Sequence, residues 1–286
     1  MSGQGAFRDD PALKAAAIAD GGAAKHPGWT SVATDEDRLA CAEAFGLSPT
    51  LVALLSCAPN VPHWPGSTER LTEYLTAIPL GSDTLAIARG WATARWSEKP
   101  FDVASRLADT PAFVVAQRII EAADPSTAER PSPKAWRQMR AELGAVEGLT
   151  PTARAYAGVV EALAWDDAGV VGVFVDVWKA WQEAIRIEHD QAEGWQQATQ
   201  DEVQAALRDA FTVARERITG RFGNDAETPE ARAAWMEEHG KIMAASPLAD
   251  THMALQRYWA EDLAPFFRAA HEQGLDSILA ACRAAG

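Results

Sequence analysis

Residues 170–222 read VVGVFVDVWKAWQEAIRIEHDQAEGWQQATQDEVQAALRDAFTVARERITGRF and carry the longest helical periodicity in the chain. Apolar residues recur there three or four positions apart, which places them on one face of an α-helix. They are Val177 or Trp178, Trp181, Ile185, Ala192 and Trp195, followed by Val203, Leu207, Phe211, Ala214, Ile218 and Phe222. At about 1.5 Å per residue, a straight helix of this length would be more than twice as long as a small domain is wide. We therefore expect one long central helix that bends, with Gly194 as its weakest point.

The start of this stretch allows two interpretations. Val170–Val175 is rich in β-branched residues and could form either the first turns of the helix or a short buried strand. We expect a helix, because the sequence contains no second strand of comparable quality to pair with it.

Helix-start signals recur along the whole chain. A hydroxyl residue can cap the free N–H groups of a helix, and a following proline fits the first helical position, where its missing donor costs nothing. The six pairs are Ser48-Pro49, Thr110-Pro111, Ser132-Pro133, Thr150-Pro151, Thr228-Pro229 and Ser246-Pro247. Together with the periodicity, they predict an all-α fold, a multi-helix globular bundle.

A segment with three prolines, residues 58–66, divides the sequence near its N-terminus. It predicts a small N-terminal helical unit, residues 1–66, and a main helical domain, residues 67–286. A single domain remains the alternative at this stage.

Composition excludes several classes. The apolar fraction of 48% is enough for a core, and the net charge of −14 disfavours a broad nucleic-acid surface, which needs clustered Lys and Arg. Three widely spaced cysteines indicate reduced thiols rather than a disulfide framework. With no signal-peptide pattern and no apolar stretch long enough to cross a bilayer, we expect a cytoplasmic protein that does not contact a membrane.

The polar interruption of the central helix is the best candidate for a functional site. Five acids and no Lys or Arg lie between Ile187 and Leu207. His189 and Glu193 are one turn apart, a spacing that suits metal ligands or acid/base groups and is also common on a solvated acidic face. We expect the helix to bend near Gly194 and leave this acidic turn solvated. The predicted partner-binding residues are Trp178, Trp181, Glu188, His189, Glu193 and Trp195.

Histidines near the C-terminus suggest an alternative. His189, His239, His252 and His271 lie in the last hundred residues, with Glu238, Asp250 and Glu272 beside three of them. Helical bundles can gather such groups into metal sites, usually through Glu-x-x-His pairs, and no such pair occurs here. Phosphate-loop, nucleophile-elbow and zinc-protease motifs are also absent, so we expect no metal and no cofactor.

A further alternative comes from Arg38 to Leu55. Ala42, Gly46 and Val52 stand at the small, turn and packing positions of a pair of helices. Over fewer than twenty residues, this spacing resembles the DNA-binding helix-turn-helix. The second helix begins Pro49-Thr50-Leu51, without the Lys, Arg, Gln or Asn that reads bases or phosphates, so a structural helical hairpin explains the same residues.

The sequence thus favours a non-catalytic interaction or adaptor protein whose acidic, Trp-lined helix binds a protein partner, one of basic character by charge. The alternatives are a metal-dependent helical-bundle enzyme using the C-terminal histidines and carboxylates, and a helix-turn-helix regulator. The oligomeric state and the identity of the partner are not predicted.

Overall fold

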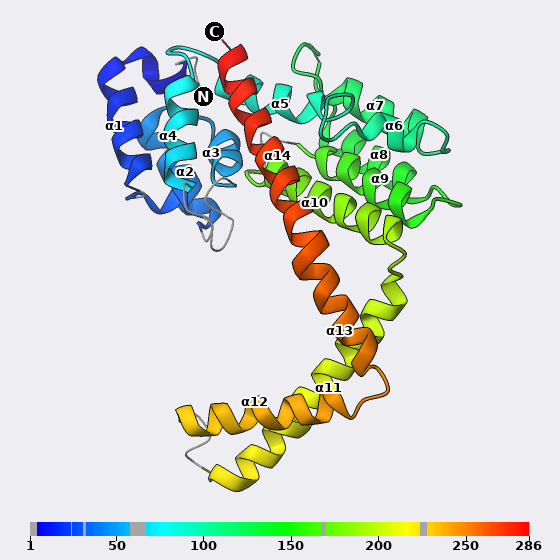
Figure 1. Cartoon of the computed structure of the whole chain (residues 1–286). Coiled ribbons are helices and arrows are strands. Elements are labelled where there is room, and N and C mark those ends of the chain that lie inside the picture. The colour runs from blue at the N-terminus through cyan, green and yellow to red at the C-terminus, as the bar shows by residue number, and fades with distance from the viewer. Residues whose placement is uncertain are drawn as a thin grey trace. The chain divides into compact units, whose positions relative to one another are not determined.

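The computed structural model describes residues 5–23, 25–30, 33–57, 67–127, 129–166, 170–223 and 228–285. Every regular element within these ranges is a helix or a helical turn, and no strand occurs among them (Figure 1). The predicted all-α, multi-helix architecture is therefore confirmed. Val173, Phe174 and Val175 belong to a helix, as expected for the β-branched run.

Contacts between Cα atoms divide the chain into two compact units. Unit 1 comprises Met1–Ile187 and Ala269–Gly286, and unit 2 comprises Glu188–Arg268. The boundary predicted from the proline-rich residues 58–66 lies outside the described residues and stays a prediction.

Among the described residues, unit 1 contains nine whole helices and parts of two more. The nine are α1 (Pro11–Gly22), α2 (Asp35–Phe45), α3 (Pro49–Leu55), α4 (Ser67–Ala77), α5 (Thr84–Ala94), α6 (Val103–Leu107), α7 (Phe113–Ala123), α8 (Pro133–Gly144) and α9 (Pro151–Leu163). Most of α10 (Val173–Ala192) also belongs to unit 1. Short 3-10 turns span Ala6–Asp9 and Pro27–Trp29. The last helix, α14 (Ala264–Ala284), contributes its residues from Ala269 onward.

Unit 2 is smaller. It contains α11 (Gln197–Phe222), α12 (Pro229–Ala244), α13 (Ala249–Tyr258), a π-helical turn (Trp259–Leu263) and the first residues of α14. Pro265 lies two residues after the π turn and cannot donate the hydrogen bond that residue 261 would accept in a regular helix. The wider turn accommodates this missing donor, with the N–H of Ala264 bonding to the carbonyl of Trp259.

Four of the six Ser/Thr-Pro pairs cap helices as the sequence predicts. The hydroxyls of Ser48, Ser132, Thr150 and Thr228 accept from backbone N–H groups three residues on, at 3.1 to 3.3 Å. The other two pairs stand two or three residues before their helices, α7 and α13. Thr110 instead donates its hydroxyl to the carbonyl of Leu107.

Gly194 ends α10, and the expected single long helix is two helices. Gly194 adopts φ +81°, a left-handed conformation that favours glycine. Its N–H bonds to the Gln191 carbonyl at 3.1 Å, and the N–H of Trp195 bonds to the Asp190 carbonyl at 2.7 Å. This pair of bonds is the Schellman motif, which satisfies the last carbonyls of a helix and stops it. The break falls at the residue that the sequence marks as weakest.

The core of unit 1 is aromatic. Its largest fully buried side chains include Trp29, Trp91 and Trp181 with Tyr74 and Tyr156. The Phe101 ring lies 4.2 Å from the Trp181 ring and connects α10 to the loop after α5. Burial of these large rings, together with the aliphatic side chains around them, stabilises the unit through the hydrophobic effect.

Within this core, α3 has no exposed face. Each residue from Thr50 to Cys57 is buried, and α2 meets α3 at 110° across Gly46. A recognition helix must present side chains to DNA, and α3 presents none. No single described helix is long and apolar enough to cross a membrane, and only this bent pair, taken together, has the length and composition.

Helix α14 approaches α10 closely at Gly274. A Cβ atom placed on Gly274 would lie 2.5 Å from the indole of Trp178 and 3.2 Å from that of Trp181. Both indoles are buried, so neither has room to move away. Gly158 in α9 serves as a control, because a Cβ atom placed on it would meet no other atom within 4 Å.

We predict that Gly274→Ala destabilises unit 1 by about 1–3 kcal/mol through overpacking. Gly158→Ala, a helix-interior glycine with free space, stabilises it by about 0.5–1 kcal/mol. Urea unfolding followed by near-ultraviolet circular dichroism measures both changes. Two shifts of the same sign would contradict the packing described for α10 and α14.

Candidate functional site

The predicted site residues do not form one surface. Trp178 and Trp181 are 3% and 0% exposed and belong to the core of unit 1. Glu188, His189 and Trp195 are partly buried in unit 2, and Glu193 is exposed. Of the six predicted residues, only Glu188, His189, Glu193 and Trp195 are accessible to a partner.

The buried carboxylate of the acidic turn at the end of α10 is Asp190, which is not among the predicted site residues. Asp190 is 4% exposed and accepts from the Tyr258 hydroxyl at 2.6 Å and from the Gln200 amide at 2.9 Å. The expectation that this whole turn is solvated is wrong for Asp190. These two neutral donors satisfy oxygens of a carboxylate that would be very costly to bury without hydrogen bonds.

Aromatic rings enclose the same turn. His189 stacks on Phe266, with ring centres 4.2 Å apart and planes 4° from parallel, and the Trp195 ring lies 5.5 Å from that of Tyr258. Trp195 and Tyr258 also join the small apolar cluster formed by Val203 and Leu255. His189 is thus held as a packing residue, and its ring stacks on a neighbour instead of projecting into solvent.

We predict that Asp190→Ala lowers the free energy of unfolding of unit 2 by about 1–3 kcal/mol, because two buried donors lose their acceptor. Glu193→Ala, on the same turn but exposed, changes it by about 0.5 kcal/mol or less. Urea titration of both variants gives the comparison. Equal effects would show that Asp190 does not organise this turn.

The histidine alternative finds no support in the geometry. Among the described residues, no three His, Cys, Asp or Glu side chains are placed to hold a metal ion. His239 stacks on Trp235, and His271 is buried with its ring 5.1 Å from that of Trp178. Burial lowers the pKa of His271 to about 4, which keeps this imidazole neutral at physiological pH.

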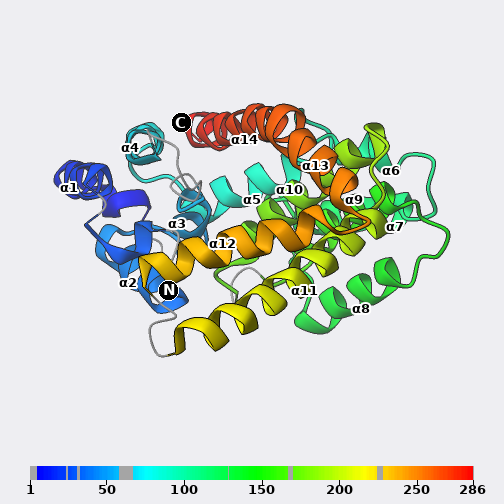
Figure 2. The ribbon, with the colours of Figure 1, turned by 60° about the horizontal axis from the view of Figure 1, so that its bottom comes forward.

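A second feature of unit 2 has the properties of a binding surface. Helices α11 and α12 lie side by side as a hairpin (Figure 2). The rings of Phe211 and Trp235 meet along one edge of their interface, at 4.9 Å, and Arg217 pairs with Glu238 along the other. These two contacts distinguish the two faces of the hairpin.

We call the face on the Phe211 side the aromatic face. Phe211 is 45% exposed and Met236, which follows Trp235, is 60% exposed. Arg208 and Arg215 stand three and four residues from Phe211, and Arg232 stands four residues from Met236, so all three share this side of their helices. No acidic residue stands three or four positions from Phe211 or Met236.

The three arginines are exposed, and none of them forms an ion pair with another residue that the structure describes. In a chain of net charge −14, the aromatic face is thus a local concentration of positive charge around apolar side chains. The spacing of Arg208, Phe211 and Arg215 was visible in the sequence. The sequence does not indicate that α12 packs beside these residues and adds Trp235, Met236 and Arg232 to the same surface.

The chain matches no protein-family model, no curated protein sequence and no solved structure. Inference about its function therefore starts from its own side chains.

Proposed function

We propose that the protein is a non-catalytic interaction protein, and that it binds an acidic amphipathic segment of a partner protein on the aromatic face of the α11–α12 hairpin. The observation that supports this proposal is the exposure of Phe211 and Met236 between three exposed arginines. Contiguous exposed apolar side chains on a soluble surface are typical of binding sites.

The residue types agree with such a role. Aromatic residues, Met and Arg are enriched at protein interfaces, where they supply contact area, adaptable packing and charged hydrogen bonds. Phe211 packs against Trp235, and Trp235 against His239, so the apolar centre is supported from beneath by rings within the hairpin. A partner would therefore meet a surface that is already ordered.

Charge selects the class of partner. A row of arginines next to apolar side chains complements a helix that carries Leu or Phe on one side and Glu or Asp beside them. The sequence alone favours a basic partner, because the whole chain is acidic. The local charge around Phe211 favours the opposite, and short-range charge decides a contact because salt screens charges beyond about 8–10 Å.

We predict that a fluorescein-labelled 18-residue amphipathic peptide with Leu on one face and Glu elsewhere binds the protein. The same peptide with Lys in place of Glu binds at least about tenfold more weakly, because it meets the arginines with like charge. Fluorescence anisotropy at 50 and 500 mM NaCl measures both, and added salt weakens the Glu peptide. Equal binding of the two peptides, or no binding of either, would reject the proposal, as would preferential binding of duplex DNA.

Matched variants locate the contact. Arg215→Glu on the aromatic face weakens the Glu peptide by about tenfold, because a charge that attracts becomes one that repels. Lys241→Glu makes the same charge change on α12 at an exposed site one turn from its partner Glu237, and leaves binding within about twofold. Phe211→Ala tests the apolar centre and weakens binding more than fivefold. A larger effect from Lys241→Glu than from Arg215→Glu would place the contact elsewhere.

A further inference from the structure

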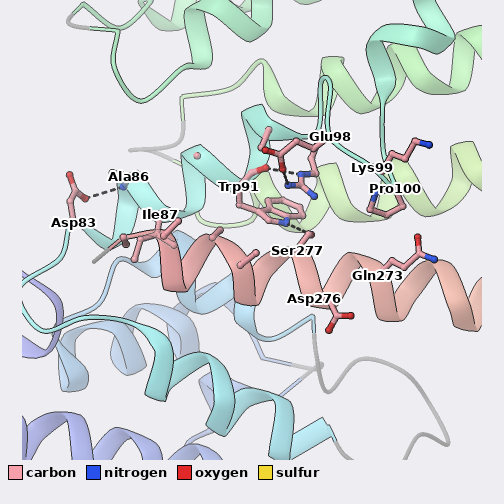
Figure 3. A pocket seen from close by; sticks show the side chains of 17 residues that line it. Asp83, Ala86, Ile87, Trp91, Glu98, Lys99, Pro100, Gln273, Asp276 and Ser277 are labelled. Carbon is pink, nitrogen blue, oxygen red and sulfur yellow. Dashed lines mark hydrogen bonds and ion pairs between the residues drawn. The ribbon is translucent and has the colours of Figure 1, made fainter.

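Unit 1 contains a groove of about 850 Å³ between α5 and the last part of α14 (Figure 3). This volume is within the range of sites that hold small organic molecules. The two helices run in opposite directions along it, with Ser277 of α14 opposite Trp91 of α5 and Gln273 near Lys99 and Pro100. The Trp91 indole donates to the Ser277 hydroxyl at 3.0 Å, which joins the two walls at the floor.

The groove has a charged end and a long apolar part. Glu98, Lys99 and Gln273 lie at the charged end, and Arg95 pairs there with Glu98. Away from it, the walls are mostly small or apolar, with Ala86, Ile87, Gly90, Ala280, Ala281 and Ala284, and Asp83 lies at the far end. From Gln273 to Ala284 the α14 wall is about 16 Å long at 1.5 Å per residue.

Most charged groups on the walls already have partners. Asp83 caps α5 by accepting from the N–H groups of Leu85 and Ala86, both at 3.0 Å. Asp276 pairs with Arg70 at 2.9 Å. Glu98 accepts from Arg95 Nη2 at 3.1 Å. The acids of the groove are therefore engaged in holding its walls.

Arg95 differs in that one of its nitrogens has no partner in the part of the chain that the structure describes, although another pairs with Glu98. Arg95 is only 3% exposed. Its guanidinium carbon lies 4.4 Å from the centre of the Phe101 ring and 5.4 Å from the centre of the Trp91 ring. Its Nε donates to the Trp91 carbonyl at 2.8 Å, whereas Nη1 is buried and has no hydrogen-bond partner among the described residues. A buried guanidinium nitrogen without an acceptor is costly, and burial lowers the pKa of Arg95 to about 10.

We propose that this groove binds a small organic acid with an apolar tail, whose carboxylate accepts from Arg95 Nη1 and whose tail lies along the alanine walls. The carboxylate supplies the missing acceptor at the charged end, and the tail covers the apolar walls of α5 and α14. Nε and Nη2 of Arg95 already bond to Trp91 and Glu98, so Nη1 is the donor left for a carboxylate oxygen, and such a charged hydrogen bond is strong. Because Nη1 is buried without a ligand, the guanidinium has to turn toward the groove on binding, while Nε keeps its bond to the Trp91 carbonyl.

The test uses the full chain and isothermal titration calorimetry with four probes of equal chain length, each below its micellar concentration. These are decanoate, decyl phosphate, decanol and decyltrimethylammonium. Decanoate is expected to bind at least about tenfold more tightly than the other three. Equal binding of decanol would show that Arg95 takes no part. Preference for decyl phosphate would overturn the assignment of a carboxylate, and no binding of any probe would overturn the site.

Variants separate a ligand site from a purely structural arginine. Ala280→Phe fills the apolar part of the groove from an exposed position without touching Arg95, and is expected to abolish decanoate binding. Ala141→Phe makes the same change on an exposed face of α8, outside the groove, and retains it. Arg95→Met is expected to remove the preference for decanoate over decanol. Binding of decanoate by Ala280→Phe with wild-type affinity would reject the proposal, whatever the stability of the Arg95 variant.

Discussion

The left-handed turn at Gly194 is the constraint that ends α10 and makes α11 a separate helix of unit 2. Without it, the apolar periodicity of residues 173–222 would continue as one helix of about 75 Å, with no core long enough to cover it. A non-glycine residue at φ +81° would be strained. Because the Schellman bonds satisfy the carbonyls of Asp190 and Gln191, the chain can leave α10 and begin α11 as a separate helix that packs on α12 and α13.

The two units of the chain, whose boundary lies within α10 at Ile187, differ in how they bury apolar surface. Unit 1 closes around tryptophan, tyrosine and phenylalanine rings from helices that are far apart in sequence. Unit 2 depends on a cluster around Val203, Leu255 and Tyr258 and on the seam between two helices. A pair of helices covers only the stripe along which they meet, so side chains on its broad faces stay in water. Phe211 and Met236 are exposed for that reason, and this geometry connects the fold with a binding role.

How far the sequence predicts this structure depends on the range of the interaction concerned. Capping by Thr150-Pro151 and Thr228-Pro229 and the break at Gly194 are local, and local chemistry was enough to predict them. Trp178 and Trp181 were assigned to a partner surface, yet they lie in the core, because a stripe of aromatic residues has the same spacing in either place. Asp190 and Arg95 could not have been found, since Tyr258 and Phe101 give them their environments only after folding. The groove likewise needs α14 beside α5, which are nearly two hundred residues apart.

Hydrogen exchange followed by mass spectrometry on the whole chain tests the central claim most directly, namely that unit 1, with its aromatic core, and unit 2, with the helix pair α11 and α12, open separately. Amides of α11 and α12 are predicted to exchange through a common opening of lower free energy than the one that exposes the amides of α9 and of α10 up to Ile187. The change between the two classes is predicted to fall near residue 188. A single opening free energy shared by α9, α10, α11 and α12 would contradict the account.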